Sequence, residues 1–301
     1  YTDLRPATAY LLTAAREAEA RAAPPGRFLS ISKMLFEPGD KAEIESIYGG
    51  VLDADALWAY LVAAKAREVL APNLPLAFGV PAADGYDGGL LPLRRYAEFA
   101  TLLLPEGTLD GRLRENLEAI PDARWLALLD VRFLITDKVG DLWAEGVYYD
   151  RQFQPELAQG APGAPDAELV LGWLPGNFAA DGLRLLCESA STAEVEVAFA
   201  DGCVLRLPLA GCAGETPVQV TWGFEATPER LTLRAGAGSL RLTGATLVNT
   251  ATGAPGAPGA SSAPSAPGAF YPLTLSERFR LVHSGDVKLY ATVAPTARRS
   301  E

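Results

Sequence analysis

The segment at residues 71–89, APNLPLAFGVPAADGYDGG, combines oxygen donors, an aromatic ring and glycines in a short space. Its two Asp residues could bind a cation, but a calcium loop needs more oxygen donors at closer spacing. Its tyrosine could stack on a sugar or cover the core, and we favour the core. We therefore interpret the segment as a glycine-mediated corner whose exposed rim contacts a ligand. The candidate binding residues are Asn73, Asp84, Tyr86, Asp87 and Arg95.

Other constellations that could carry catalysis are missing from the sequence. His283 is the only histidine, and it lies beside a predicted Ser284-Gly285-Asp286 turn, where we interpret it as a surface residue. There is no G-x-S-x-G, no C-x-x-C, no phosphate-binding glycine loop and therefore no predicted catalytic residue, metal or cofactor. A pair of carboxylates for glycoside hydrolysis stays open, because their separation depends on the fold.

Composition and charge restrict the class of protein. The 301 residues are 49% hydrophobic and 21% charged, as in folded globular proteins, and the formal net charge of −11 argues against nucleic acid as a partner. The most apolar helical stretch is interrupted by Lys65, Arg67 and Glu68, so we expect a soluble chain. Because it begins at Tyr1 without a signal segment, we expect a mature product or an excised piece.

The three cysteines, Cys187, Cys203 and Cys212, allow one disulfide plus a thiol, or three thiols. By their alternation with leucines, Cys187 and Cys203 both point inward. We favour buried thiols over a bridge, because unpaired cysteine is among the most buried residue types.

Helical and strand-like patterns alternate over residues 1–157 and predict an α/β domain. A Gly/Ala/Pro-rich linker follows at 158–168. The predicted helices are LRPATAYLLTAAREAEARAA, DADALWAYLVAAKAREVL, LPLRRYAEFATLL and LRENLEAI, and the predicted strands are FLSIS, LPLAFGV and VRFLITDK.

Residues 169–301 change to period two and predict a jelly-roll-like, carbohydrate-module-like β-sandwich. The clearest unit is a hairpin in which alternating apolar residues precede an Asp201-Gly202 turn. A low-complexity loop at 250–270 interrupts the sandwich. Its outward face carries arginines interspersed with glutamates, which we interpret as a solvated surface and not as a basic stripe. The arginines are Arg184, Arg206, Arg230, Arg234 and Arg241.

Five segments in order, PATAYLL, GRFLSIS, PNLPLAFGV-x4-GYDGGLLPLRRYAEF, WLALLDVRFLITDK and FRLVHSGDVKLY, carry a resemblance to a known family. Together they resemble the large C-terminal extracytoplasmic region of bacterial YfhO-type multi-pass membrane proteins, which are glycosyltransferase-C-like. The most specific piece joins Asn73 to Gly85-Tyr86-Asp87 and Arg95-Tyr96, and the next is the Ser284–Tyr290 segment.

This resemblance implies a non-catalytic, extracytoplasmic domain tethered to the cytoplasmic membrane by helices outside the given sequence. The implied partners are a glycan or polyprenyl-linked sugar and the membrane-embedded catalytic part, whose acids lie outside this sequence. Two alternatives remain: a secreted glycosidase that uses a carboxylate pair, and a purely structural cell-surface domain.

Overall fold

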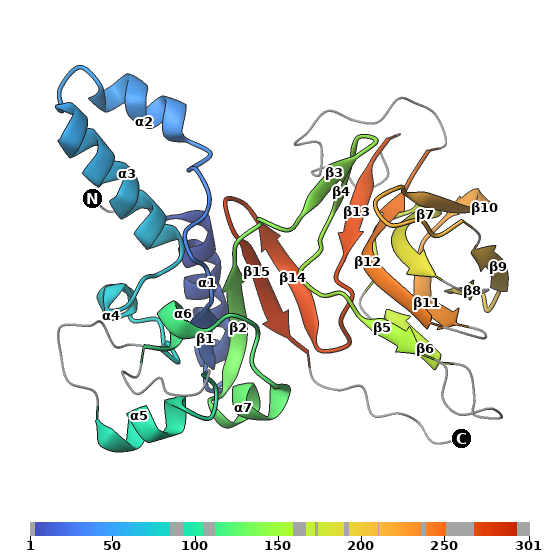
Figure 1. Cartoon of the computed structure of the whole chain (residues 1–301), viewed down its shortest axis with the longest axis horizontal. Coiled ribbons are helices and arrows are strands. Elements are labelled where there is room, and N and C mark those ends of the chain that lie inside the picture. The colour runs from blue at the N-terminus through green and yellow to red at the C-terminus, as the bar shows by residue number, and fades with distance from the viewer. Residues whose placement is uncertain are drawn as a thin grey trace. The chain divides into compact units, whose positions relative to one another are not determined.

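The protein consists of two compact units, seen in the computed structural model in Figure 1. The structure describes residues 4–84, 93–104, 112–158, 167–171, 174–189, 193–209, 211–235, 239–250 and 268–293. The first unit combines Tyr1–Val139 with Leu281–Ala294, and the second holds Gly140–Arg280. The expected combination of an α/β part with a β-sandwich is confirmed.

The first unit combines helices with a small mixed sheet. Its helices are α1 (Pro6–Ala20), α2 (Lys41–Tyr48), α3 (Ala54–Glu68), α4 (Leu74–Phe78), α5 (Arg94–Ala100), α6 (Leu113–Asn116) and α7 (Ala123–Leu128). The sheet has the order β1-β2-β15-β14, with β1 (Arg27–Ser30), β2 (Val131–Thr136), β15 (Lys288–Thr292) and β14 (Phe279–Ser284). β1 and β2 are parallel, whereas β15 is antiparallel to β2.

The local sequence explains where the principal helices begin. Pro6 lies in the first turn of α1, where its missing N–H costs no hydrogen bond. Asp53 caps α3, because its carboxylate accepts a hydrogen bond from the Ala56 N–H at 2.8 Å. Helix α1 then packs through Ala7 and Leu11 into a core shared with β1, β2 and β15.

The segment LPLAFGV, predicted as a strand, forms the short helix α4 instead. Asn73 and Gly79 at its two ends adopt left-handed backbone angles, with φ of 71° and 66°. A strand cannot run through such residues, and Pro75 fits the first helical turn. The prediction was wrong because apolar runs this short have no decisive period.

Two antiparallel sheets form the β-sandwich of the second unit. One sheet has the order β10-β7-β12-β13, with β5 paired to β12, and the other has the order β6-β11-β8-β9. The strands of the two sheets are β5 (Glu156–Ala158), β6 (Ala167–Leu171), β7 (Ala180–Ser189), β8 (Ala193–Phe199), β9 (Val204–Leu209), β10 (Val218–Ala226), β11 (Pro228–Ala235), β12 (Ser239–Val248) and β13 (Phe270–Leu273). Strands β3 (Leu142–Ala144) and β4 (Val147–Tyr149) pair with each other in a separate two-stranded sheet. Side chains from both sheets form one apolar core.

The predicted hairpin is present as β8 and β9. Alternate residues of β8 are buried, and Gly202 has the positive φ, 83°, that the turn requires. The outward arginines lie among carboxylates, as the sequence interpretation expected: Arg234 lies 3.3 Å from Glu196, and Arg206 lies 2.9 Å from the same residue. Glu196 therefore bridges these two arginines.

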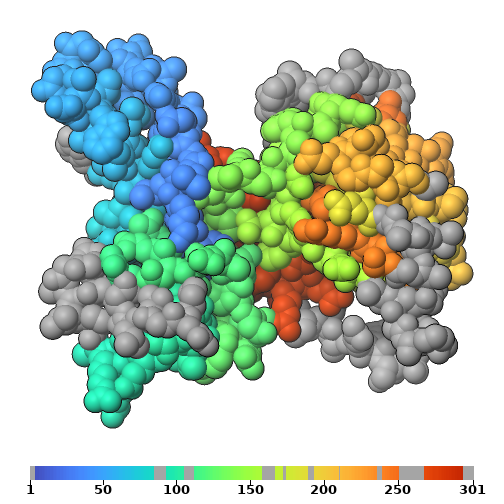
Figure 2. All heavy atoms as spheres, viewed as in Figure 1, coloured from blue at the N-terminus to red at the C-terminus, as the bar shows by residue number. Residues whose placement is uncertain are grey.

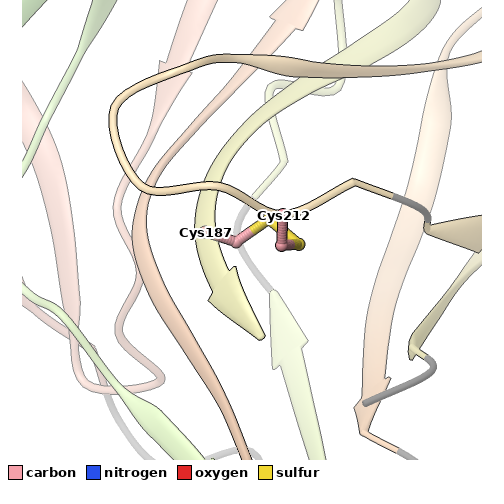
Figure 3. Close-up of a disulfide and its surroundings, with 2 residues drawn as sticks. All are labelled: Cys187 and Cys212. Carbon is pink, nitrogen blue, oxygen red and sulfur yellow. A yellow bond between two sulfur atoms is a disulfide. The ribbon is translucent and has the colours of Figure 1, made fainter. Parts of the chain in front are cut away.

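A disulfide joins Cys187 of β7 to Cys212, as Figure 3 shows. The preference for three thiols was therefore wrong, although Cys187 is fully buried as expected. Cys203 is the free cysteine, and it is exposed, contrary to the inward orientation expected for it. The alternation fails there because β9 begins only at Val204, which leaves Cys203 in the turn.

The division between the units differs from the expected boundary at 158–168. It falls after Val139, and the C-terminal strand β15 belongs to the first unit. The reason is non-local: β15 pairs with β2, so Leu289 lies opposite Ile135 in the core of the α/β unit. Most of the linker lies outside the described residues.

The loop at 250–270 connects two paired strands, and residues 251–267 lie outside the described part. Asn249 and the residues after the loop close its base, with Asn249 N–H donating to the Ala269 carbonyl at 3.0 Å and Gly268 N–H to the Asn249 carbonyl at 2.9 Å.

Replacing 251–267 with a short Gly-Ser link should change the free energy of unfolding by less than about 0.6 kcal/mol, the cost of one doubling of loop length. Urea unfolding measures this, and a loss above about 1.5 kcal/mol would mean that the loop packs on the sandwich.

Candidate functional site

The first unit contains a cleft of about 540 Å³ between the start of α1 and the helical hairpin of α2 and α3. Figure 1 shows the two helices of the hairpin, and their atoms form the lighter blue lobe in Figure 2. The volume falls in the range of small-molecule sites. The lining is mixed: apolar residues alternate with two arginines and three carboxylates.

Arg5, directly before α1, is the ionic centre of this cleft. Its Nη1 donates to Asp40 Oδ2 at 2.6 Å, its Nη2 to Asp286 Oδ2 at 2.8 Å, and its Nε to Glu68 Oε2 at 3.1 Å. The Arg5 side chain is only 13% exposed. One guanidinium therefore joins three segments that are distant in the sequence.

Glu68, the last residue of α3, is completely buried behind Arg5. Its second oxygen, Oε1, accepts a hydrogen bond from the Ala7 N–H at 3.3 Å, in the first turn of α1. A carboxylate is favourable there because the helix dipole is positive at that end. Burial nevertheless outweighs the attraction of Arg5 and raises the pKa of Glu68.

The other two carboxylates lie closer to solvent. A hydrogen bond from Arg5 lowers the pKa of Asp40, whose side chain is 40% exposed, so Asp40 is ionised at neutral pH. Asp286 also accepts a hydrogen bond through Oδ1 from the Gly39 N–H at 2.9 Å. A Cβ at Gly39 would lie 2.8 Å from this oxygen, so a larger residue there would displace the Asp286 carboxylate.

Two tyrosines form an aromatic wall of the cleft. Tyr48 ends α2 and Tyr60 lies within α3, and their ring centroids are 4.9 Å apart with the planes inclined by 40°. Ile44 and Ile47 of α2 continue this wall. The cleft thus combines ring faces with charged hydrogen-bonding groups, a set that suits a polar ligand with an apolar face.

Three of the five binding residues predicted from the sequence lie within the described part of the chain. Asn73 is exposed at the start of α4, and Arg95 is exposed on α5. Asp84 is buried, and its Oδ2 accepts a hydrogen bond from the Arg114 N–H at 2.9 Å, at the start of α6. Tyr86 and Asp87 lie outside the described residues. Asp84 thus has a local structural contact, and the ligand role of this rim stays a prediction.

His283 is half-buried, in contrast to the surface position that the sequence interpretation assigned. Burial, with the nearby Lys138 charge, lowers the pKa of its imidazole. Within the described ranges, no group of three or more His, Cys, Asp or Glu side chains could hold a metal ion. No helix of the same ranges is long and apolar enough to span a membrane.

Sequence reasoning missed the principal residues of the cleft. Arg5 was taken only as part of a helix start, and Asp286 only as part of a turn. A usable signal lay in Glu68, a charged residue directly before the buried Val69 and Leu70. Such a residue needs a buried partner, although the sequence does not say which.

Comparisons with known proteins give limited similarity. No protein-family model matches the chain, and no curated protein matches it. The solved structures that match include a mutant of a family 29 carbohydrate-binding module in complex with mannohexaose; it is 10% identical, and the alignment covers 31% of this chain and 89% of that one, with a TM-score of 0.19. A second structure, titled as a family 29 carbohydrate-binding module, has the same identity and TM-score and is covered to 86%.

Proposed function

We propose that this chain is a non-catalytic extracytoplasmic domain that binds carbohydrate in the cleft beside α2 and α3. The observation that carries the proposal is the Tyr48–Tyr60 wall facing a cleft that also holds Asp40 and Glu43. Sugar rings present apolar C–H faces that stack on aromatic rings, and their hydroxyl groups donate hydrogen bonds to carboxylates.

The disulfide supports a location outside the cytoplasm. Disulfides persist in oxidising compartments and are rare in the cytosol. The Cys187–Cys212 bridge lies in the sandwich core region, with Cys187 fully buried. This agrees with the extracytoplasmic side that the resemblance to YfhO-type proteins implies.

The arrangement of acids favours binding over the alternative of a glycosidase. A carboxyl group of raised pKa beside one of lowered pKa is a typical acid and base pair, and Glu68 and Asp40 have these shifts. However, Glu68 is fully buried, is not part of the cleft wall, and accepts a hydrogen bond from a backbone N–H of α1. A general acid has to reach the leaving-group oxygen, and Glu68 does not.

A glycan array followed by calorimetry tests the binding function. We expect the protein to bind at least one oligosaccharide, and Tyr60→Leu to weaken that binding by about tenfold, equivalent to about 1.4 kcal/mol. Leucine keeps apolar contact with Tyr48 but removes the ring. Trp58→Leu is the matched control, because Trp58 is an exposed aromatic residue of the same helix that does not line the cleft.

Two outcomes would contradict the function. One is that no glycan binds, which would favour a purely structural domain. The other is that a folded Tyr60→Leu protein keeps its full affinity, which would place binding elsewhere. The membrane-protein origin that the resemblance implies has a separate test: the coding sequence upstream of Tyr1 should encode many apolar helices, and a signal peptide there instead would support a secreted protein.

A further inference from the structure

Three of the five charged groups that line the cleft are acidic. A carbohydrate site can carry a net charge of either sign, so this excess of acids bears on which sugar the cleft binds. Its carboxylates belong to Asp40, Glu43 and Asp286, and its guanidinium groups to Arg5 and Arg67. All three nitrogen positions of Arg5 already donate to carboxylates, and one of these belongs to the buried Glu68. The charge of Arg5 is therefore already balanced by carboxylates, which weakens its attraction for a phosphate or a uronic acid.

Two of the carboxylates are available to a ligand. Glu43 is exposed, and it forms no ion pair within the part of the chain that the structure describes. Asp40 lines the cleft with a side chain that is 40% exposed; its Oδ2 accepts from Arg5, whereas its Oδ1 is buried. A carboxylate oxygen can accept more than one hydrogen bond, so Asp40 Oδ2 can accept from a ligand as well as from Arg5.

The aromatic wall of Tyr48 and Tyr60 also favours a cationic ligand. The faces of tyrosine rings carry negative potential and attract cations, most strongly where water is displaced. The pair formed by Tyr48 and Tyr60 borders the same cleft as Glu43 and Asp40. Rings and carboxylates together favour a protonated amine.

We propose that the sugar bound in this cleft is an amino sugar with a free, protonated amine, held by Glu43 and Asp40 against the rings of Tyr48 and Tyr60. This inference rests on the proposed carbohydrate-binding function and specifies its ligand class. It makes a polyprenyl-phosphate headgroup a weaker ligand than an amine for this cleft, because the phosphate would face Glu43 and Asp40.

Two probes of equal length and linkage test the inference: chitohexaose, which is fully N-acetylated, and its fully deacetylated counterpart, hexaglucosamine. In calorimetry of the whole chain at pH 5.5, hexaglucosamine should bind at least tenfold more tightly. Glu43→Gln should weaken its binding about three- to tenfold. Glu45→Gln is the matched control, because it makes the same charge change on the same exposed helix outside the cleft wall and should have less than a twofold effect.

Each other outcome has a separate meaning. Equal or tighter binding of chitohexaose would overturn the amine inference and leave the carbohydrate function standing. If Glu45→Gln weakened hexaglucosamine as much as Glu43→Gln, the attraction would be to the acidic surface as a whole, and the inference would also fail. If neither these sugars nor any glycan on the array bound, the proposed function itself would fall.

Discussion

Replacing Arg5 with methionine should reduce the free energy of unfolding of the first unit by about 3 to 5 kcal/mol, the cost of leaving a buried charge without its partner. Glu68 has no solvent contact, so its carboxylate cannot recover the lost interaction from water. Methionine is long enough to fill most of the vacated space, so the effect isolates the charge. Hydrogen exchange of the amides of β1, β2 and α1 measures the loss within this unit.

The loss of stability in Arg5→Met should depend on pH, in a direction that follows from the pKa of Glu68. Burial already raises the pKa of Glu68, and Arg5 opposes that rise; without Arg5 the pKa rises further. A carboxyl group whose folded pKa lies above its unfolded value stabilises the fold most at pH values below the unfolded pKa. That stabilisation is lost as the pH rises through the folded pKa. The difference between variant and parent should therefore be larger at pH 8 than at pH 5.

Two further variants make this prediction specific. Adding Glu68→Gln to Arg5→Met removes the uncompensated charge and should recover part of the stability. Arg21→Met is the control, since the Arg21–Glu17 pair is more than half exposed and should contribute less than about 1 kcal/mol. An Arg5→Met protein as stable as the Arg21→Met protein would show that the cluster does not hold α1 to α3.

The sequence predicts the elements whose signals are local. Helix α3 has an Asp cap and good helix formers, and the hairpin of β8 and β9 has alternation around a glycine turn. Helix α4 was predicted as a strand, because so short an apolar run has no decisive period. The left-handed backbone angles of Asn73 and Gly79, which bound the helix, cannot be read from the sequence.

The cleft could not be predicted in the same way. Its ionic centre joins Arg5 to residues 35, 63 and 281 positions away, and no periodicity reports on such separations. The sequence could place Asp286 at a turn and Arg5 at a helix start. Only the pairing of β15 with β2 and the packing of α1 beside α3 bring the two together.

Removing the disulfide should destabilise the second unit by about 3 to 4 kcal/mol, because the bridge closes a loop between cysteines 25 positions apart and so limits the entropy of the unfolded chain. The double variant Cys187→Ala/Cys212→Ala tests this, and alanine avoids burying a hydroxyl group at the fully buried Cys187. Urea unfolding of the second unit, followed by hydrogen exchange of β7 and β12, gives the measurement.

Reduction of the parent protein should produce the same shift, and a reductant should have no additional effect on the double variant. Cys203→Ala is the control: Cys203 is exposed and unbridged, so its replacement should change the free energy of unfolding by less than about 0.5 kcal/mol. Alkylation of the unfolded, unreduced chain should label one cysteine, and alkylation after reduction should label three. If the oxidised and reduced proteins unfolded at the same urea concentration, the bridge would not stabilise the sandwich. If three cysteines were labelled before reduction, the bridge would be absent, and the extracytoplasmic assignment would lose its structural support.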